Sequence, residues 1–163
     1  MIGLRKFSPE DSTALVALLN NYKVTRYLST RLPFPYSPQD ADWWISTGCK
    51  NGIVRAITVD GELAGCVGAE VGAFEESRAA EIGYWLGEPF WGAGHATHAL
   101  DALTRMVFSE TDIVRIYAPV FSPNLASMRV LEKCGYQLEG IFRKGCYKDG
   151  TFYDRHIFAK IQS

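Results

Sequence analysis

The chain has 163 residues, of which 47% are hydrophobic and 21% charged, and its formal net charge is −1 at pH 7. These values predict one globular domain over residues 1–163 with a core of its own, and they argue against disorder. The near-neutral charge argues against a direct nucleic-acid partner or an anionic membrane surface. No apolar run reaches the roughly eighteen residues of a transmembrane helix.

The first half of the chain predicts one strand, two helices and a hairpin of two strands. Ser8 is a typical N-cap residue and Pro9 suits the first helical position, so a helix follows the first strand. Asp60-Gly61 is a strong signal for a tight hairpin turn. The predicted segments are a strand at Ile2–Phe7, a helix with the stripe Leu15, Leu18 and Leu19, a proline-rich loop at Leu32–Pro38, a helix carrying Trp43, Trp44 and Ile45, and strands at Ile53–Val59 and Leu63–Val71.

The second half alternates strands and helices. Asn124 follows Ser122-Pro123 as the cap of a helix that Gly135 ends. The predicted segments are a strand at Glu81–Leu86, a helix with Ala96, Ala99, Leu100, Leu103 and Val107 on one face, a strand at Ile113–Val120, a helix with the stripe Leu125, Met128 and Leu131, and strands at Gln137–Tyr147 and Thr151–Ile161. This order predicts a mixed α/β sheet with helices on its faces.

The stretch Trp91-Gly92-Ala93-Gly94-His95-Ala96-Thr97 lies between a predicted strand and a predicted helix. Backbone N–H groups and the helix dipole converge at such a junction, so it suits a phosphate or diphosphate group. A P-loop is excluded because no Lys-Ser or Lys-Thr pair follows the glycines. A dinucleotide-binding fingerprint fits poorly, because Thr97 stands where its third glycine belongs. The two glycines on their own also suit a plain strand-to-helix turn.

Several segments together resemble the GNAT acetyltransferases. Gly94 and Ala96 match their acyl-coenzyme A loop, [Q/R]-x-x-G-x-[G/A], with Trp91 in the first position. Asn124–Tyr136 resembles their second cofactor motif, N-x-x-S-x-x-x-L-E-K-x-G-[FY], and Gly150–Asp154 resembles the G-x-x-x-D of their final hairpin. The Trp-Gly form of the loop and the Asn-to-Ser spacing point to the branch of ribosomal-protein-alanine N-terminal acetyltransferases.

This resemblance implies an α/β (α+β) fold, with a mixed central sheet splayed between its fourth and fifth strands and helices on both faces. Acetyl-coenzyme A would lie in the splay. Backbone groups of the fourth strand would hold its pantetheine, and N–H groups of the glycine loop would hold its diphosphate. The cofactor-binding residues implied are Tyr84, Trp85, Leu86, Trp91, Gly92, Ala93, Gly94, His95, Ala96, Thr97, Asn124, Ser127 and Arg129.

The family reaction is direct transfer of an acetyl group from a thioester to a primary amine in a ternary complex. It needs a base for the amine, donors for the oxyanion and an acid for the thiolate. The resemblance makes Glu81 the first choice of base and Asp154 the second, although Glu81 also reads as an ordinary exposed strand-end carboxylate. The family's tyrosine acid is absent, since its position is Leu131. Ser127 is then the first candidate acid and Tyr136 the second.

The acceptor site is predicted from Arg26–Tyr36, Trp43, Trp44 and the final hairpin. The resemblance makes a protein N-terminal α-amine of the ribosomal-protein-alanine type the favoured acceptor. The first alternative is a small-molecule amine such as a polyamine, an amino acid or an aminoglycoside. Two further alternatives for the function are a non-catalytic acyl-coenzyme A sensor and a nucleotide-binding module. A homodimer follows from the family likeness alone.

The four cysteines, Cys49, Cys66, Cys134 and Cys146, form no C-x-x-C pair. With an N-terminus too polar to resemble a signal peptide, we predict reduced thiols and a cytoplasmic location. The three histidines have no metal-ligand spacing, so no metal site is predicted. A helix C-terminus raises a thiol pKa, which disfavours Cys134 as a covalent nucleophile.

Overall fold

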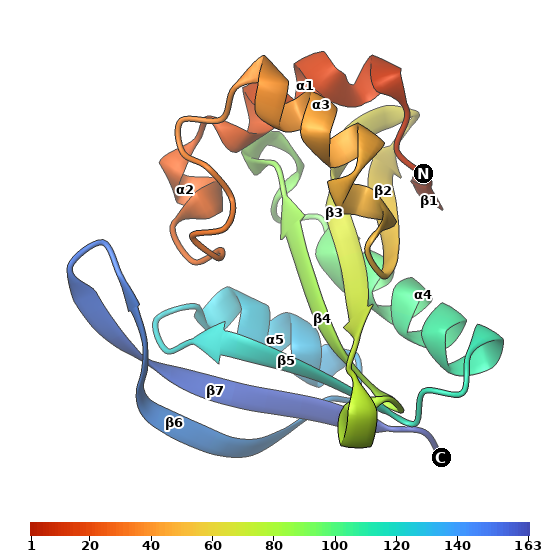
Figure 1. Ribbon diagram of the computed structural model, residues 1–163, viewed down its shortest axis with the longest axis vertical. Coiled ribbons are helices and arrows are strands. Elements are labelled where there is room, and N and C mark those ends of the chain that lie inside the picture. The colour runs from red at the N-terminus through yellow and green to blue at the C-terminus, as the bar shows by residue number, and fades with distance from the viewer.

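The computed structural model describes residues 1–163 and contains one seven-stranded sheet in the order β1-β2-β3-β4-β5-β7-β6 (Figure 1). Neighbouring strands are antiparallel except β4 and β5, which are parallel. The strands are β1 Ile2–Arg5, β2 Ile53–Val59, β3 Glu62–Val71, β4 Ala79–Leu86, β5 Arg115–Phe121, β6 Gln137–Lys148 and β7 Thr151–Ile161.

The helices are α1 Ser12–Leu19, α2 Tyr22–Thr25, α3 Pro38–Ser46, α4 His95–Glu110 and α5 Leu125–Lys133, with 3-10 turns at Pro9–Asp11, Gly48–Lys50, Phe74–Glu76 and Glu88–Phe90. The sequence did not predict α2, because four residues are too few to show a helical period. The Asn21 side chain begins it by accepting a hydrogen bond from the Lys23 N–H (3.0 Å). None of the helices is both long and apolar enough to cross a membrane.

The two faces of the sheet carry different helices and different cores. A cluster of 19 buried residues lies on the face covered by α4 and α5, and a cluster of 7 lies on the face covered by α1 and α3. Since successive strand residues point to opposite faces, the neighbours Ala56 and Ile57 belong to different clusters. The predicted mixed α/β sheet with helices on both faces is therefore confirmed.

The sheet opens between β4 and β5. Only Ala79–Glu81 of β4 pair with β5, and the partners end at Tyr117. The rest of β4, up to Leu86, pairs with β3 alone, and the rest of β5, up to Phe121, pairs with β7 alone. Figure 1 shows β4 turning away from β5 beyond this point. The predicted splay between the fourth and fifth strands is confirmed, and it leaves two backbone edges facing an opening.

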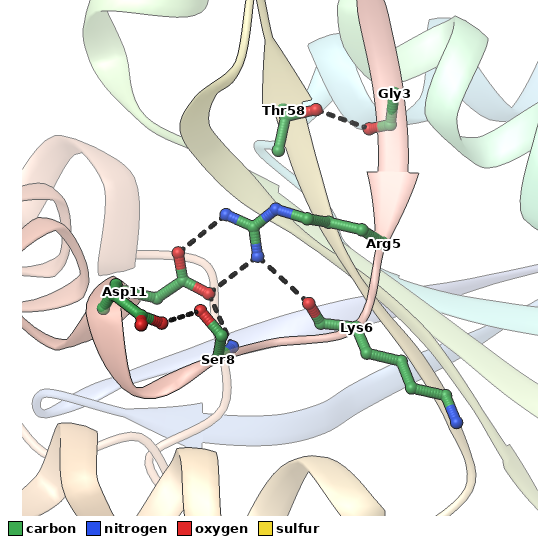
Figure 2. A network of polar contacts seen from close by, with 7 residues as sticks. Gly3, Arg5, Lys6, Ser8, Asp11 and Thr58 are labelled. Atoms are coloured by element: carbon green, nitrogen blue, oxygen red, sulfur yellow. Dashed lines mark hydrogen bonds and ion pairs between the residues drawn. The ribbon is translucent and has the colours of Figure 1, made fainter.

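Arg5, at the end of β1, is joined to the start of the first helical segment by a polar network (Figure 2). Its guanidinium donates two hydrogen bonds of 2.8 Å each to the carboxylate of Asp11, which is only 4% exposed. The same carboxylate accepts the Ser8 N–H at 2.9 Å. These bonds lower the pKa of Asp11, chiefly through Arg5. The network sets where the chain leaves the sheet for α1.

An Asp11→Ala variant is expected to lose about 2–3 kcal/mol of folding free energy, because Arg5 loses both of its hydrogen bonds to the carboxylate and the Ser8 N–H loses its acceptor. Denaturant unfolding at pH 7 measures this. Because the folded pKa of Asp11 is lowered, its contribution is present above the unfolded value of about 3.9 and disappears as the pH falls through the folded value. The difference between the variant and the parent chain should therefore shrink below about pH 4.

Asp42→Ala is the matched control, since Asp42 is exposed and accepts only a 3.3 Å bond from the Ser12 hydroxyl. Its loss should stay within about 0.5 kcal/mol. Equal losses in the two variants would contradict a special role for the Arg5–Asp11 pair.

Candidate active site

Two cavities meet at the opening in the sheet. The first, of about 800 Å³, lies between β4 and β5, and the second, of about 590 Å³, lies on the face covered by α1 and α3. Both volumes are within the usual range for small-molecule sites. The residues that line both cavities are Leu28, Ser29, Arg31, Glu70, Glu81, Gly83 and Tyr84.

The glycine loop lies where the chain passes from β4 to α4. Gly92 and Gly94 have φ values of 82° and 78°, which side-chain-bearing residues rarely adopt, and Gly94 is the N-cap of α4. The first carbonyl-bonded N–H of the helix is that of His98, which donates to Gly94 O (3.1 Å). The N–H groups before it are available to an anion. A Cβ at either glycine would meet no protein atom within 4 Å, so space for a ligand lies beside the loop.

Trp91, the first residue of the glycine loop, anchors the loop through its side chain. Its indole N–H donates to Leu86 O at 2.7 Å, which ties the loop to the end of β4. The residues Trp91 to Thr97 do not line either cavity, and neither does Arg129. The predicted diphosphate-binding residues therefore lie at the end of the splayed strand, outside the two cavities.

Tyr84, Ser127 and Asn124 form a connected group on the wall of the first cavity. The Tyr84 hydroxyl and the Ser127 Oγ are 2.8 Å apart, and the Ser127 N–H donates to Asn124 Oδ1 at 3.2 Å. Burial raises the pKa of Tyr84 to about 12, so the phenol stays protonated at neutral pH. Sequence reasoning used only the backbone of Tyr84. No local signal reveals its partner, which is 43 residues away along the chain.

Glu81 lies at the point where β4 and β5 separate. It is exposed, lines both cavities, and is the strand partner of Tyr117 in β5 and of Glu70 in β3. Burial and, after it, the Glu81 charge raise the pKa of Tyr117. None of the five ion pairs of the chain includes Glu70 or Glu81. Both carboxylates are therefore free to meet a cation. Sequence reasoning missed Glu70 because its position depends on strand register.

Tyr136 is the predicted catalytic residue that the structure keeps away from the opening. It is only 2% exposed, and its hydroxyl lies 2.7 Å from the Thr104 Oγ1 of α4. Burial raises the pKa of the Tyr136 phenol above its ordinary value. Asp154, the second-choice base, accepts the Lys144 N–H (2.8 Å) within the β6–β7 hairpin and lines neither cavity. Neither the Tyr136 nor the Asp154 side chain therefore lines a cavity at the opening in the sheet.

Cys134 and Trp85 both pack against apolar clusters of the core. Cys134 is buried, burial raises its thiol pKa, and its thiol donates to Thr97 O at 3.4 Å. Trp85 packs against the smaller apolar cluster, under α1 and α3. All four cysteines are free thiols. The structure forms no cluster of three or more His, Cys, Asp or Glu side chains suited to a metal ion.

The β6–β7 hairpin is tied to the segment around α2. The Lys148 ammonium donates to Thr25 O and Leu28 O, both at 2.7 Å, and the Tyr22 hydroxyl donates to Asp149 (2.9 Å). Burial lowers the pKa of Lys148. The final hairpin and the Arg26–Tyr36 segment, both predicted to form the acceptor site, are therefore in contact. Part of Arg26–Tyr36 lines each cavity, the hairpin lines the first, and Trp43 and Trp44 line the second.

Comparison with known proteins identifies the family. The model of an acetyltransferase (GNAT) domain matches residues 2–137. The chain is 34% identical to YoaA of Bacillus subtilis (strain 168), named an uncharacterized N-acetyltransferase, over 98% of this chain and 92% of YoaA. The solved structure of RimL, a ribosomal L7/L12 alpha-N-protein acetyltransferase in complex with coenzyme A as a cysteine disulfide, has a TM-score of 0.87 at 26% identity and covers 99% of this chain and 94% of RimL. Mycobacterium smegmatis RimJ, in complex with a coenzyme A disulfide, has a TM-score of 0.86 at 25% identity, with 98% and 81% covered.

The chain therefore belongs to the GNAT acetyltransferase family. It is an acetyl-coenzyme A-dependent N-acetyltransferase, so the predicted family, enzyme class and cosubstrate are confirmed. The residues present suit this cosubstrate. The open space beside Gly92 and Gly94 fits a diphosphate, and the unpaired edges of β4 and β5 fit an extended arm with amide groups.

Proposed function

We propose that this chain, acting as a single domain over residues 1–163, acetylates a protein N-terminal α-amine of the ribosomal-protein type by direct attack in a ternary complex. The observation that carries the proposal is that Glu81 and the Tyr84–Ser127 pair line one cavity at the opening between β4 and β5. The likeness over nearly the whole chain to RimL, a ribosomal L7/L12 alpha-N-protein acetyltransferase, supports the choice of acceptor.

The cosubstrate is held by main-chain groups of one continuous segment. The N–H groups of Gly92 to Thr97 bind its diphosphate, and the free backbone edge of Tyr84 to Leu86 binds its pantetheine amides. Asn124, the N-cap of α5, and Arg129, on the exposed side of the same helix, contact the cosubstrate from there. When bound, acetyl-coenzyme A supplies an acyl group already activated as a thioester.

Glu81 accepts the proton of the acceptor ammonium, directly or through a water molecule. Its carboxylate is exposed, forms no ion pair and lies at the junction of the two cavities. A backbone N–H near Tyr84 stabilises the developing oxyanion. The Tyr84 phenol, protonated at neutral pH, and the Ser127 hydroxyl bonded to it supply a proton toward the leaving sulfur.

Tyr84→Phe and Ser127→Ala are each expected to lower kcat about tenfold, because either change breaks the only hydrogen bond that joins the two hydroxyls. The double variant should lose little more than either single variant, since residues that act as a unit are not additive. Steady-state release of free thiol measures this. Ser109→Ala, which alters an exposed serine of α4, is the control and should keep the parent rate. Independent, multiplying losses would contradict a shared proton path.

A panel of amines with acetyl-coenzyme A tests the proposed acceptor. Peptides with free N-termini, polyamines, amino acids and aminoglycosides are compared by thiol release and by mass spectrometry of the product. Acetylation of peptide α-amines supports the proposal. A preference for small amines would favour the first alternative. Coenzyme A binding without release for any amine would favour a sensor.

We infer a cytoplasmic location from the four free thiols, which suit a reducing compartment. A homodimer is proposed from family likeness alone, and light scattering coupled to size exclusion tests it.

A further inference from the structure

Two glycines face each other in the middle of the sheet. Gly68 of β3 is the direct strand partner of Gly83 of β4. A glycine inside a strand weakens it and often marks a place where a ligand approaches the backbone. A Cβ at Gly68 would come within 3.1 Å of a Val54 methyl carbon, so packing explains part of that choice. A Cβ at Gly83 would meet nothing within 4 Å, so packing does not explain a glycine there.

The glycine pair lies on the sheet face covered by α1 and α3, where the second cavity is. Strand partners lie on one face, so Gly68 and Gly83 form a floor without side chains between the Cys66–Trp85 pair and the Glu70–Glu81 pair. The side walls are mostly apolar. Trp43, 60% exposed, lies on one of them. The residues of these walls are Leu15, Leu19, Leu32, Tyr36, Trp43 and Trp44.

One end of this cavity is acidic. Glu70 and Glu81 are directly opposite each other on β3 and β4, a placement of like charges that costs stability. Neither carboxylate forms an ion pair, and Arg31, the basic residue that lines the same cavity, forms none either. Such a pair attracts a cation that is not part of the chain. An ammonium group beside an apolar side chain matches both the charge and the walls.

We propose that the second cavity is the specificity pocket for the acceptor, and that it selects a primary amine whose adjacent side chain is a large apolar group such as that of Leu, Met or Phe. The ammonium lies between Glu70 and Glu81, and the side chain lies over Gly68 and Gly83. This inference rests on the proposed acetylation of N-terminal amines and refines it. A cavity of about 590 Å³ is far larger than an alanine methyl group needs.

Gly83→Val places a side chain on the floor of the pocket, where its Cβ would meet no protein atom within 4 Å, and Gly140→Val is its matched control. Gly140 lies in β6, its added Cβ would also meet nothing within 4 Å, and it lines neither cavity. Peptides that differ only in a first residue of Ala, Leu or Phe are compared. With the parent chain, kcat/KM should be about tenfold higher for Leu and Phe than for Ala.

In the Gly83→Val variant the ratio of kcat/KM for the Leu and Phe peptides to that for the Ala peptide should fall from about ten to about one. Gly140→Val should behave as the parent chain. Equal losses for all three peptides, or no preference in the parent chain, would overturn the pocket.

Glu70→Gln should raise KM for the Leu peptide about fivefold with kcat unchanged, the pattern of a group that binds the ground state and the transition state alike. Glu62→Gln, which alters an exposed β3 carboxylate outside both cavities, should leave KM and kcat for the Leu peptide unchanged. An unchanged KM in Glu70→Gln would overturn the ammonium position.

Calorimetric titration of the peptides into the chain saturated with coenzyme A separates this inference from the proposed reaction. Binding that prefers Leu and Phe and is lost in Gly83→Val supports the pocket even if no thiol is released, and in that case the proposed reaction fails instead. Turnover without such a preference overturns the pocket and leaves the reaction standing.

Discussion

Glu81→Gln is expected to lower kcat by about 100-fold or more, because the amide cannot accept a proton at neutral pH and a positioned base typically contributes that much. The change keeps the shape of the side chain. It also removes one of two like charges on adjacent strands, so the folding free energy should stay equal or rise slightly. Coenzyme A affinity should not change. Lower turnover with full stability is the signature of a chemical role.

Thiol release at saturating acetyl-coenzyme A and acceptor measures kcat, and calorimetry with coenzyme A measures the affinity. Glu62→Gln serves as the control, since that exposed β3 carboxylate lines neither cavity. A kcat within threefold of the parent value would remove Glu81 as the base. Such a result would leave solvent or a substrate-derived group to take the proton.

Gly94→Val is expected to weaken coenzyme A binding by about 100-fold. The φ value of 78° is strained for a β-branched residue by about 1–2 kcal/mol, and relief of that strain would turn the loop amides away from their common target. The added side chain also occupies the open space in which the diphosphate is proposed to lie. Calorimetric titration of coenzyme A, with circular dichroism to check the fold, gives the result.

Gly61→Val is the matched control for this change. Gly61 has a φ of 84°, open space around its Cβ, and a place in the β2–β3 turn away from the opening in the sheet. Both variants should lose a similar folding free energy, but only Gly94→Val should lose the cosubstrate. If both variants bound coenzyme A with the parent affinity, the glycine loop would be only a strand-to-helix turn.

Local signals predicted most of the elements. Asp60 and Gly61 do adopt positive φ values, 50° and 84°, in a tight turn between β2 and β3. Asn124 caps α5 by accepting the Ser127 N–H, as its position before an apolar stripe predicted. Each signal acts within a few residues, so the neighbours along the chain were enough to read it.

Strand ends were less accurate where apolar residues continue beyond the pairing. The predicted strand from Ile113 begins at Arg115 in β5, and the predicted strand to Phe7 ends at Arg5 in β1. Ile113 is buried in the larger cluster without belonging to a ladder. Burial and strand pairing give the same pattern of apolar residues, and only the partner strand distinguishes them.

The chain by itself determined the order of strands and helices apart from the short helix α2, the glycine loop and the family, because these depend on turn chemistry, caps and short motifs. Tertiary structure decided which side chains meet: Ser127 beside Tyr84, Glu70 beside Glu81, and Tyr136 inside the core instead of at the opening. Those outcomes follow from strand register and helix docking between residues far apart in sequence. A shift of one residue in register would move each side chain to the other face of the sheet.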